Sequence, residues 1–105
     1  MRVIEQQMNQ AILNGVNWKN GNTQVIFNEN NVTWDVLLYG NKIATLTDTS
    51  IQLFSAGYKT KTTKSRLNAI LSVHGNCDSV YQKDGEWFVS TKIGRFPFTE
   101  GMILC

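Results

Sequence analysis

Apolar residues recur at helical spacing in two stretches of the chain. The first stretch, residues 2–14, follows the i, i+4, i+7, i+8 pattern of a helix with one buried face, and Gly15 is a suitable end for it; its apolar positions are Ile4, Met8, Ala11 and Ile12. The second stretch, residues 62–74, has one apolar stripe and ends before Gly75-Asn76; the stripe contains Leu67, Ile70, Leu71 and His74. The pattern therefore predicts two amphipathic helices.

Between these helices the periodicity changes to two. Residues 32–39 alternate strictly between two faces of a predicted strand. One face contains Val32, Trp34, Val36 and Leu38, and the other contains Thr33, Asp35, Leu37 and Tyr39. Turn-forming residues, including Gly40-Asn41, separate this segment from its neighbours. We therefore predict four strands in an antiparallel meander, over residues 23–28, 32–39, 42–47 and 50–56. The Asn- and Gly-rich residues 17–22 are predicted to form a loop.

The C-terminal third contains a second β signal. Residues 79–83 and 86–90 are strand-like, and Asp84-Gly85 between them is typical of a hairpin turn. Residues 91–105 contain so many apolar side chains that we expect this tail to be packed. Together the elements predict one α+β domain over residues 1–105: an N-terminal helix, a four-stranded antiparallel meander, a second helix and a C-terminal β-hairpin, with both helices on one face of the sheet.

Composition agrees with one folded domain. The 105 residues are 42% hydrophobic and 10% aromatic with a single proline, which is not the composition of a disordered chain. No apolar run approaches the ~20 residues that a membrane-spanning helix needs, and residues 1–7 lack an apolar signal core. Two cysteines form no disulfide framework, so we predict that Cys77 and Cys105 are not linked and that the compartment is reducing.

Charge is distributed unevenly. The net charge is only +2, but no acid occurs between Thr49 and Cys77, and four bases fall within eight residues: Lys59, Lys61, Lys64 and Arg66. These bases surround the predicted start of the second helix, where the helix dipole favours acids. We expect all four side chains to be exposed and to form one positive surface. The alternative is an ordinary solvent-exposed helix start that binds no ligand and is capped by Thr62 or Thr63.

An anion would turn this arrangement from unfavourable to favourable, because it would meet cations, hydroxyls and exposed N–H groups. The candidate residues for binding nucleic acid or another anion are therefore Tyr58, Lys59, Thr60, Lys61, Thr62, Thr63, Lys64 and Arg66. Tyr58 is the candidate for stacking on a base. Trp18, in a polar segment, is the candidate anchor for a protein partner.

The sequence lacks the residue sets that most catalytic sites and metal sites require. A structural zinc site needs four ligands with close pairs, but the chain offers only Cys77, Cys105 and His74. His74 lies on the apolar stripe of a predicted helix, where a structural role is favoured over that of a general base. No glycine-rich phosphate loop and no paired carboxylates occur. We therefore predict a protein that is not an enzyme and that holds no metal or cofactor.

Two segments carry a family resemblance. Leu38-Tyr39-Gly40-Asn41-Lys42-Ile43-Ala44 and the stretch from Gly57 to Leu71, which includes Thr60-Lys61-Thr62-Thr63-Lys64-Ser65-Arg66-Leu67-Asn68, resemble a group of small uncharacterised proteins of tailed bacteriophages. The similarity covers roughly residues 32–90, and that group usually has His or a similar residue where Tyr39 stands. The resemblance implies a phage protein with a small accessory role inside a bacterium.

These observations leave three functional hypotheses. The leading one is a non-enzymatic phage accessory protein that binds a nucleic acid or a nucleoprotein machine in the host cytoplasm. The alternative is an inhibitor of a host or anti-phage defence enzyme, such as a CRISPR or restriction component, that acts by protein–protein contact. A third is a protein that sequesters or transforms a small phosphorylated ligand. The sequence predicts no membrane partner and leaves the oligomeric state open.

Overall fold

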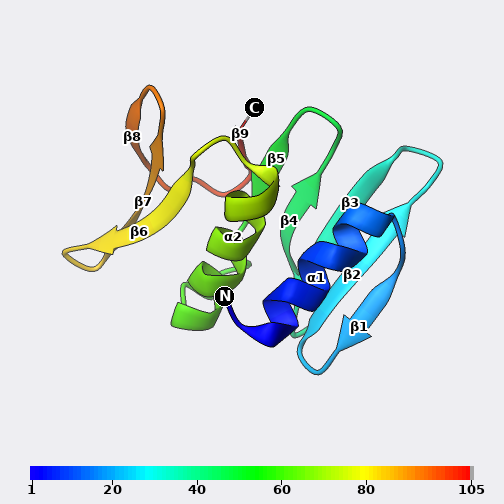
Figure 1. The fold of residues 1–105 in the computed structure, drawn as a ribbon. Coiled ribbons are helices and arrows are strands. Elements are labelled where there is room, and N and C mark those ends of the chain that lie inside the picture. The colour runs from blue at the N-terminus through cyan, green and yellow to red at the C-terminus, as the bar shows by residue number, and fades with distance from the viewer. Residues whose placement is uncertain (105) are drawn as a thin grey trace.

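The computed structural model describes residues 1–104 and contains two helices and two antiparallel sheets within that range (Figure 1). The fold is α+β, as predicted. In chain order the elements are α1 (Val3–Asn14), β1 (Trp18–Asn20), β2 (Thr23–Asn28), β3 (Thr33–Leu38), β4 (Asn41–Leu46), β5 (Ile51–Leu53), α2 (Lys61–His74), β6 (Ser79–Lys83), β7 (Glu86–Thr91), β8 (Gly94–Pro97) and β9 (Met102–Leu104).

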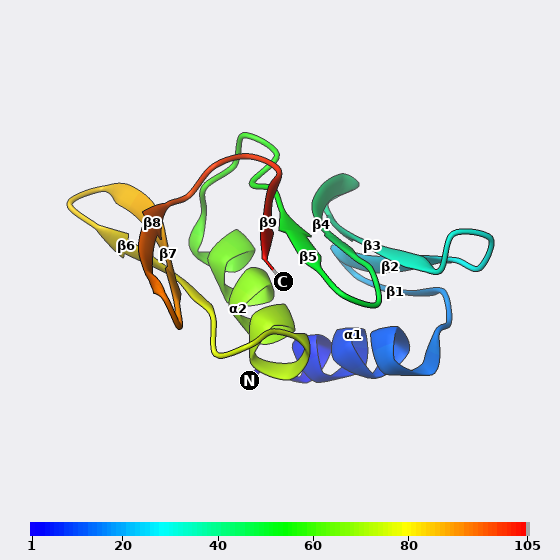
Figure 2. The ribbon, with the colours of Figure 1, turned by 90° about the horizontal axis from the view of Figure 1, so that it is seen from above.

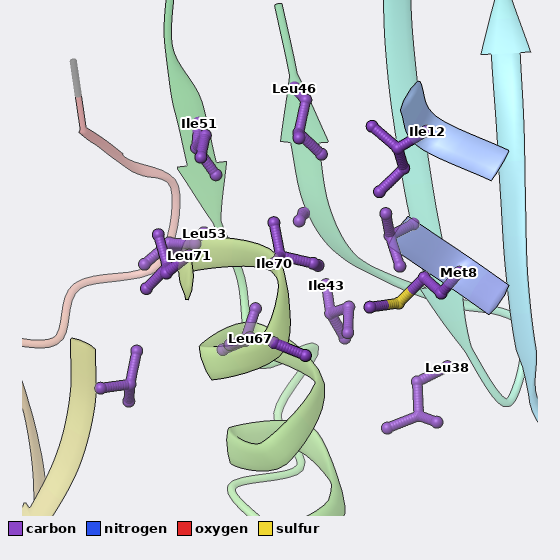
Figure 3. Packing of buried hydrophobic residues seen from close by; sticks show 14 of the residues in the cluster. Met8, Ile12, Leu38, Ile43, Leu46, Ile51, Leu53, Leu67, Ile70 and Leu71 are labelled. Atoms are coloured by element: carbon purple, nitrogen blue, oxygen red, sulfur yellow. The ribbon is translucent and has the colours of Figure 1, made fainter. Parts of the chain in front are cut away.

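The larger sheet has the strand order β1-β2-β3-β4-β5-β9, and the smaller sheet has the order β6-β7-β8. Both helices cover the same face of the larger sheet, as Figure 2 shows, with α1 against β2 and α2 against β4. The core lies between these layers. Figure 3 shows Met8 of α1 and Ile70 of α2 on either side of Ile43 of β4; all three side chains are at most 1% exposed.

The two helices begin and end close to where the sequence predicts. Gly15 ends α1 in the left-handed conformation, with a φ of 62°, and its N–H donates to the carbonyls of Ala11 and Ile12. Thr60 caps α2, because its hydroxyl accepts a hydrogen bond from the Thr63 N–H at 3.2 Å. The cap is therefore Thr60 rather than Thr62 or Thr63, and α2 begins one residue earlier than predicted.

One predicted turn is displaced by a residue. The β3–β4 turn is formed by Tyr39 and Gly40, which have φ values of 52° and 77°, and Asn41 already belongs to β4. Two consecutive positive φ angles match the tight turn whose twist suits a hairpin. The same geometry occurs at Asp84-Gly85, with φ values of 52° and 81°, which confirms that predicted turn.

The meander is longer than the four predicted strands. Residues 17–22 are not a loop, because Trp18–Asn20 forms β1 and pairs with β2. The tail is packed as expected, but it divides: β8 extends the predicted hairpin to a three-stranded sheet, and β9 pairs with β5 of the larger sheet. Pairing over three residues leaves almost no periodicity to detect, which explains why β1 and β9 escape prediction.

Candidate functional site

The segment before α2 is a loop held in place by its own backbone and by one distant carboxylate. The N–H of Ser55 donates to both carboxylate oxygens of Glu100, at 3.1 and 2.8 Å, and the Ser55 hydroxyl also donates to Glu100. The N–H of Tyr58 donates to the Ser55 carbonyl at 2.9 Å. The hydroxyl of Thr63, in the first turn of α2, donates to the Tyr58 carbonyl at 2.9 Å. The loop therefore presents Tyr58 and Lys59 from a fixed backbone.

Three of the four predicted bases lie at this surface. Lys59 and Lys61 are exposed and Lys64 is half-buried. The one ion pair in the described part of the chain involves none of them. The Lys59 ammonium lies 5.8 Å from the centre of the Phe98 ring, a distance at which a cation–π attraction acts. We call Lys59, Lys61 and Lys64 the lysine surface.

Arg66 does not belong to this surface, and the expectation that it is exposed is wrong. Its side chain is 3% exposed, and its Nη1 lies 2.8 Å from Oε2 of Glu5 in α1. Its Nε donates to the Thr23 hydroxyl at 3.0 Å, and its Nη2 donates to Oδ1 of Asn22 at 3.3 Å. Arg66 follows the buried Thr63 by three residues, so the two share the inner face of α2. The arginine therefore joins α1, α2 and β2.

The Glu5 carboxylate is the ion-pair partner of Arg66. Burial raises its pKa, but hydrogen bonds from Ser65, Arg66 and the Arg2 N–H, together with the positive charge of Arg66, outweigh burial and leave the pKa below its usual value. The Ser65 hydroxyl donates to Oε2 at 2.6 Å. The acid missing near Arg66 in the sequence is thus supplied by α1.

The three predicted threonines have different surroundings. Thr60 is exposed, and its hydroxyl caps the helix and lies 3.0 Å from that of Thr63. Thr63 is 1% exposed, and its hydroxyl is bound to the Tyr58 carbonyl, so it holds the loop instead of facing solvent. Thr62 is half-buried. Of the predicted hydroxyls, those of Thr60 and Thr62 stay nearest to the surface.

A cavity of about 420 Å³ adjoins the lysine surface. It lies between the β3–β4 turn and the loop before α2, both at the lower end of the molecule in Figure 1. Tyr39 and Tyr58 line it and are 74% and 62% exposed. Its other lining residues are Leu38, Asn41, Ile43, Ser55, Ala56, Thr60 and Thr63. We call this space the hairpin cavity.

Sequence reasoning missed Tyr39 and Asn41 as site residues. The signal was present, because the resemblance to phage proteins runs through both Leu38–Ala44 and the segment from Gly57 onward. The fold brings these two segments together around the hairpin cavity. Periodicity alone assigns Tyr39 to the end of a strand and gives no reason to relate it to Tyr58.

Trp18 is not an anchor in a free loop. It lies in β1, where it pairs with Val25, and it is half-buried against the hydrophobic core. The strand uses part of the indole for packing, so less of it is available to a protein partner.

The remaining residues that metals or catalysis favour are scattered. Within residues 1–104, no three His, Cys, Asp or Glu side chains are placed to hold a metal ion. His74 Nε2 lies 3.1 Å from Oδ1 of Asn9, and burial lowers the pKa of the imidazole. Cys77 is exposed. That it forms no disulfide with Cys105 stays a prediction, because Cys105 lies outside the described residues. Neither of the two helices described is long and apolar enough to cross a membrane.

Comparison with protein-family models identifies the family of the chain. A family model described as "Kyanoviridae Gp96 protein" matches residues 1–105. No curated protein and no solved structure matches the chain. The match confirms the coarser part of the resemblance drawn from the sequence, namely that this is a phage protein. Because the match spans the whole length, the chain belongs to the Kyanoviridae Gp96 family.

Proposed function

We propose that this protein is a non-enzymatic phage accessory protein that binds single-stranded nucleic acid, alone or within a nucleoprotein machine, in the cytoplasm of the host bacterium. The observation that carries the proposal is the lysine surface. Three cations surround the start of α2, where the helix dipole adds positive potential, and the ion pair among the described residues lies elsewhere. Such a surface attracts phosphate groups.

The polarity of the surroundings supports a polyanion. The first turn of α2 contains no acid. Glu100 is the carboxylate held at the neighbouring loop, where it accepts hydrogen bonds from the Ser55 N–H. Three lysines against one bound carboxylate leave an excess of positive charge, whereas the rest of the chain outside residues 59–66 has six bases and eight acids.

The exposed tyrosine favours single strands over duplexes. Tyr58 directly precedes Lys59, so a ring and an ammonium group project from neighbouring positions of the same loop. Aromatic rings stack on bases only where the bases are unpaired, and each such contact is worth about 1–3 kcal/mol. A base on Tyr58 would place its phosphate near the lysine surface.

The test is a fluorescence-anisotropy titration of single-stranded DNA, single-stranded RNA and duplex DNA at several salt concentrations. The parent protein should bind single strands at low salt. Lys59→Ala/Lys61→Ala/Lys64→Ala should reduce the slope of log affinity against log salt by about 2, because each lost phosphate contact on a single strand removes roughly 0.7. The matched control is Lys19→Ala/Lys83→Ala/Lys92→Ala, which removes three exposed lysines elsewhere and should change the slope little. No binding at low salt, or equal loss in the control, contradicts the proposal.

A second candidate function rests on a different surface. Ile93, Phe96 and Ile103 are 88%, 41% and 60% exposed, and they line one cavity of about 470 Å³ between β8 and β9. Exposed apolar patches of this kind mark protein contacts. This face supports the alternative of an inhibitor that binds a host or defence enzyme. A complex with one host protein that survives nuclease treatment and is lost in Ile93→Asp/Ile103→Asp would favour it.

A further inference from the structure

We infer that the hairpin cavity receives one unpaired nucleobase, which contacts both Tyr39 and Tyr58. This inference rests on the proposed function and adds the chemical group that the site selects. It extends the site from the lysine surface to the β3–β4 hairpin, which the charge pattern of the sequence does not include in the predicted site.

The cavity has the composition that a base requires. Its volume of about 420 Å³ falls within the range of small-molecule pockets, ~300–1,000 Å³. Leu38 and Ile43, which are 5% and 1% exposed, give it apolar lining from the core. A nucleobase is a flat aromatic body with a polar edge, so it matches a site with an apolar lining, two tyrosine rings and a few hydrogen-bonding groups.

Hydrogen-bonding groups stand beside the rings. The Asn41 carboxamide lines the cavity and donates one bond to the Tyr39 carbonyl, at 3.4 Å. That bond leaves the amide oxygen and the second N–H able to pair with a base edge. Thr60 lines the same space from the start of α2. Its hydroxyl accepts from the Thr63 N–H and donates to the Thr63 hydroxyl, because the Thr63 proton is given to the Tyr58 carbonyl, so one acceptor lone pair remains for an N–H of a base.

Tyr39 occupies a position that does not suit it on structural grounds. It is the first of the two central residues of a turn that needs positive φ at both of them, and its φ is 52°. Asn, Asp and Gly are the usual residues there, because an aromatic side chain in the left-handed region is strained. Its ring is also 74% exposed, so packing in the free protein does not offset the strain. A ligand that covers the ring would do so, and strained residues cluster at ligand sites.

Two exposed lysines neighbour the cavity-lining segments in the sequence, but neither of them lines the cavity. Lys42 follows Asn41 on the hairpin, and Lys59 follows Tyr58 on the loop, so each tyrosine segment has its own lysine. The Lys42 ammonium lies 5.2 Å from the centre of the Phe54 ring, which restricts its position. The Lys59 ammonium likewise lies 5.8 Å from the centre of the Phe98 ring, so both cations are held beside rings outside the cavity lining and would meet phosphates of a bound strand only beyond it.

The test compares an intact oligothymidylate with an abasic oligonucleotide of the same length, and repeats the comparison with oligouridylate to distinguish DNA from RNA. The parent protein should bind the intact strands roughly 5- to 100-fold more tightly than the abasic strand, as expected for one stacked base. Tyr39→Asn and Tyr58→Ala should each lose most of that preference and leave abasic binding unchanged. Tyr39→Phe, which keeps the ring, should bind like the parent.

Stability provides a second readout. Tyr39→Asn should raise the melting temperature, because Asn adopts positive φ more easily, so reduced binding cannot be attributed to unfolding. Equal affinity for intact and abasic strands, with loss only in the lysine variant, overturns the base site and leaves the proposed function standing. No binding of either strand overturns both.

Discussion

Lys64 and Arg66 lie two residues apart in α2, but their charges have opposite surroundings. Arg66 points inward, is 3% exposed and binds Glu5, Thr23 and Asn22. Lys64 is half-buried, belongs to the lysine surface with Lys59 and Lys61, and takes no part in the ion pair. A run of bases in a sequence therefore need not form one surface, because the position of each residue in the helical turn decides which side of the helix it occupies.

Removing a charge from the two sides of α2 should change the free energy of unfolding by different amounts. Removing one partner of a buried ion pair leaves an uncompensated charge in the interior and costs about 3–5 kcal/mol, whereas surface charges change stability by about 0.5 kcal/mol or less. We therefore expect the fold to depend on the buried charges on the inner side of α2. The three lysines on the outer side take no part in the ion pair found among the described residues, and we expect folding not to require them.

The largest expected effect is on the inner side. Arg66→Ala leaves Glu5 buried without its partner, so the free energy of unfolding should fall by about 3–5 kcal/mol in urea denaturation. Lys64→Ala is the matched control and should stay within about 0.5 kcal/mol of the parent. A loss below about 1 kcal/mol for Arg66→Ala would contradict a structural role for this ion pair. The double variant Glu5→Leu/Arg66→Met should recover much of the stability, because an apolar pair leaves no buried charge behind.

Acid should weaken the inner side next. The pKa of Glu5 is lowered in the folded protein, so its contribution to stability is present above the usual value of 4.5 and is lost as the pH falls through the folded pKa. The pKa of His74 is also lowered, so stability should begin to decline once the pH falls below 6.5. Urea denaturation at a series of pH values measures both contributions. The Glu5→Leu/Arg66→Met variant should keep the decline in stability that begins below pH 6.5 and lose the part of the decline below pH 4.5 that Glu5 contributes. An unchanged pH dependence below 4.5 in this variant would show that Glu5 does not contribute to it.

The smallest expected effect is on the outer side. Lys59→Ala/Lys61→Ala/Lys64→Ala should leave the melting temperature nearly unchanged or raise it slightly, because the dipole at the start of α2 disfavours cations there. Thermal denaturation followed by circular dichroism measures the shift. A loss larger than about 1 kcal/mol would show that these lysines, like Arg66, stabilise the fold.

The sequence predicts local structure well where the chain itself supplies the cause. Gly15 ends α1 through its own left-handed conformation, and Asp84-Gly85 makes its turn without help from distant residues. The α+β class and the two helices follow from such local signals. Strand β1 and strand β9 do not, because each has three residues and depends on a partner strand for its existence.

The candidate site is predictable only on one side. Lys59 and Lys61 are exposed, as the charge pattern predicts, and so is Tyr58 beside them. The prediction that Arg66 is exposed is wrong because its ion-pair partner, Glu5, lies 61 positions away in the sequence. Tyr39 is missed for the same reason: its relation to Tyr58 exists only after the hairpin and the α2 loop have met around one cavity.

We propose that the outer side of the α2 start and the β3–β4 turn form one binding site, distinct from the structural inner side of α2. Titration of the isotopically labelled protein with oligothymidylate, followed by NMR of the backbone amides, tests it most directly. We expect shift changes at Tyr39–Asn41 and Tyr58–Lys64, and almost none around Ile93 and Ile103. Changes confined to the face around Ile93 and Ile103, or no changes at any amide, would contradict the claim.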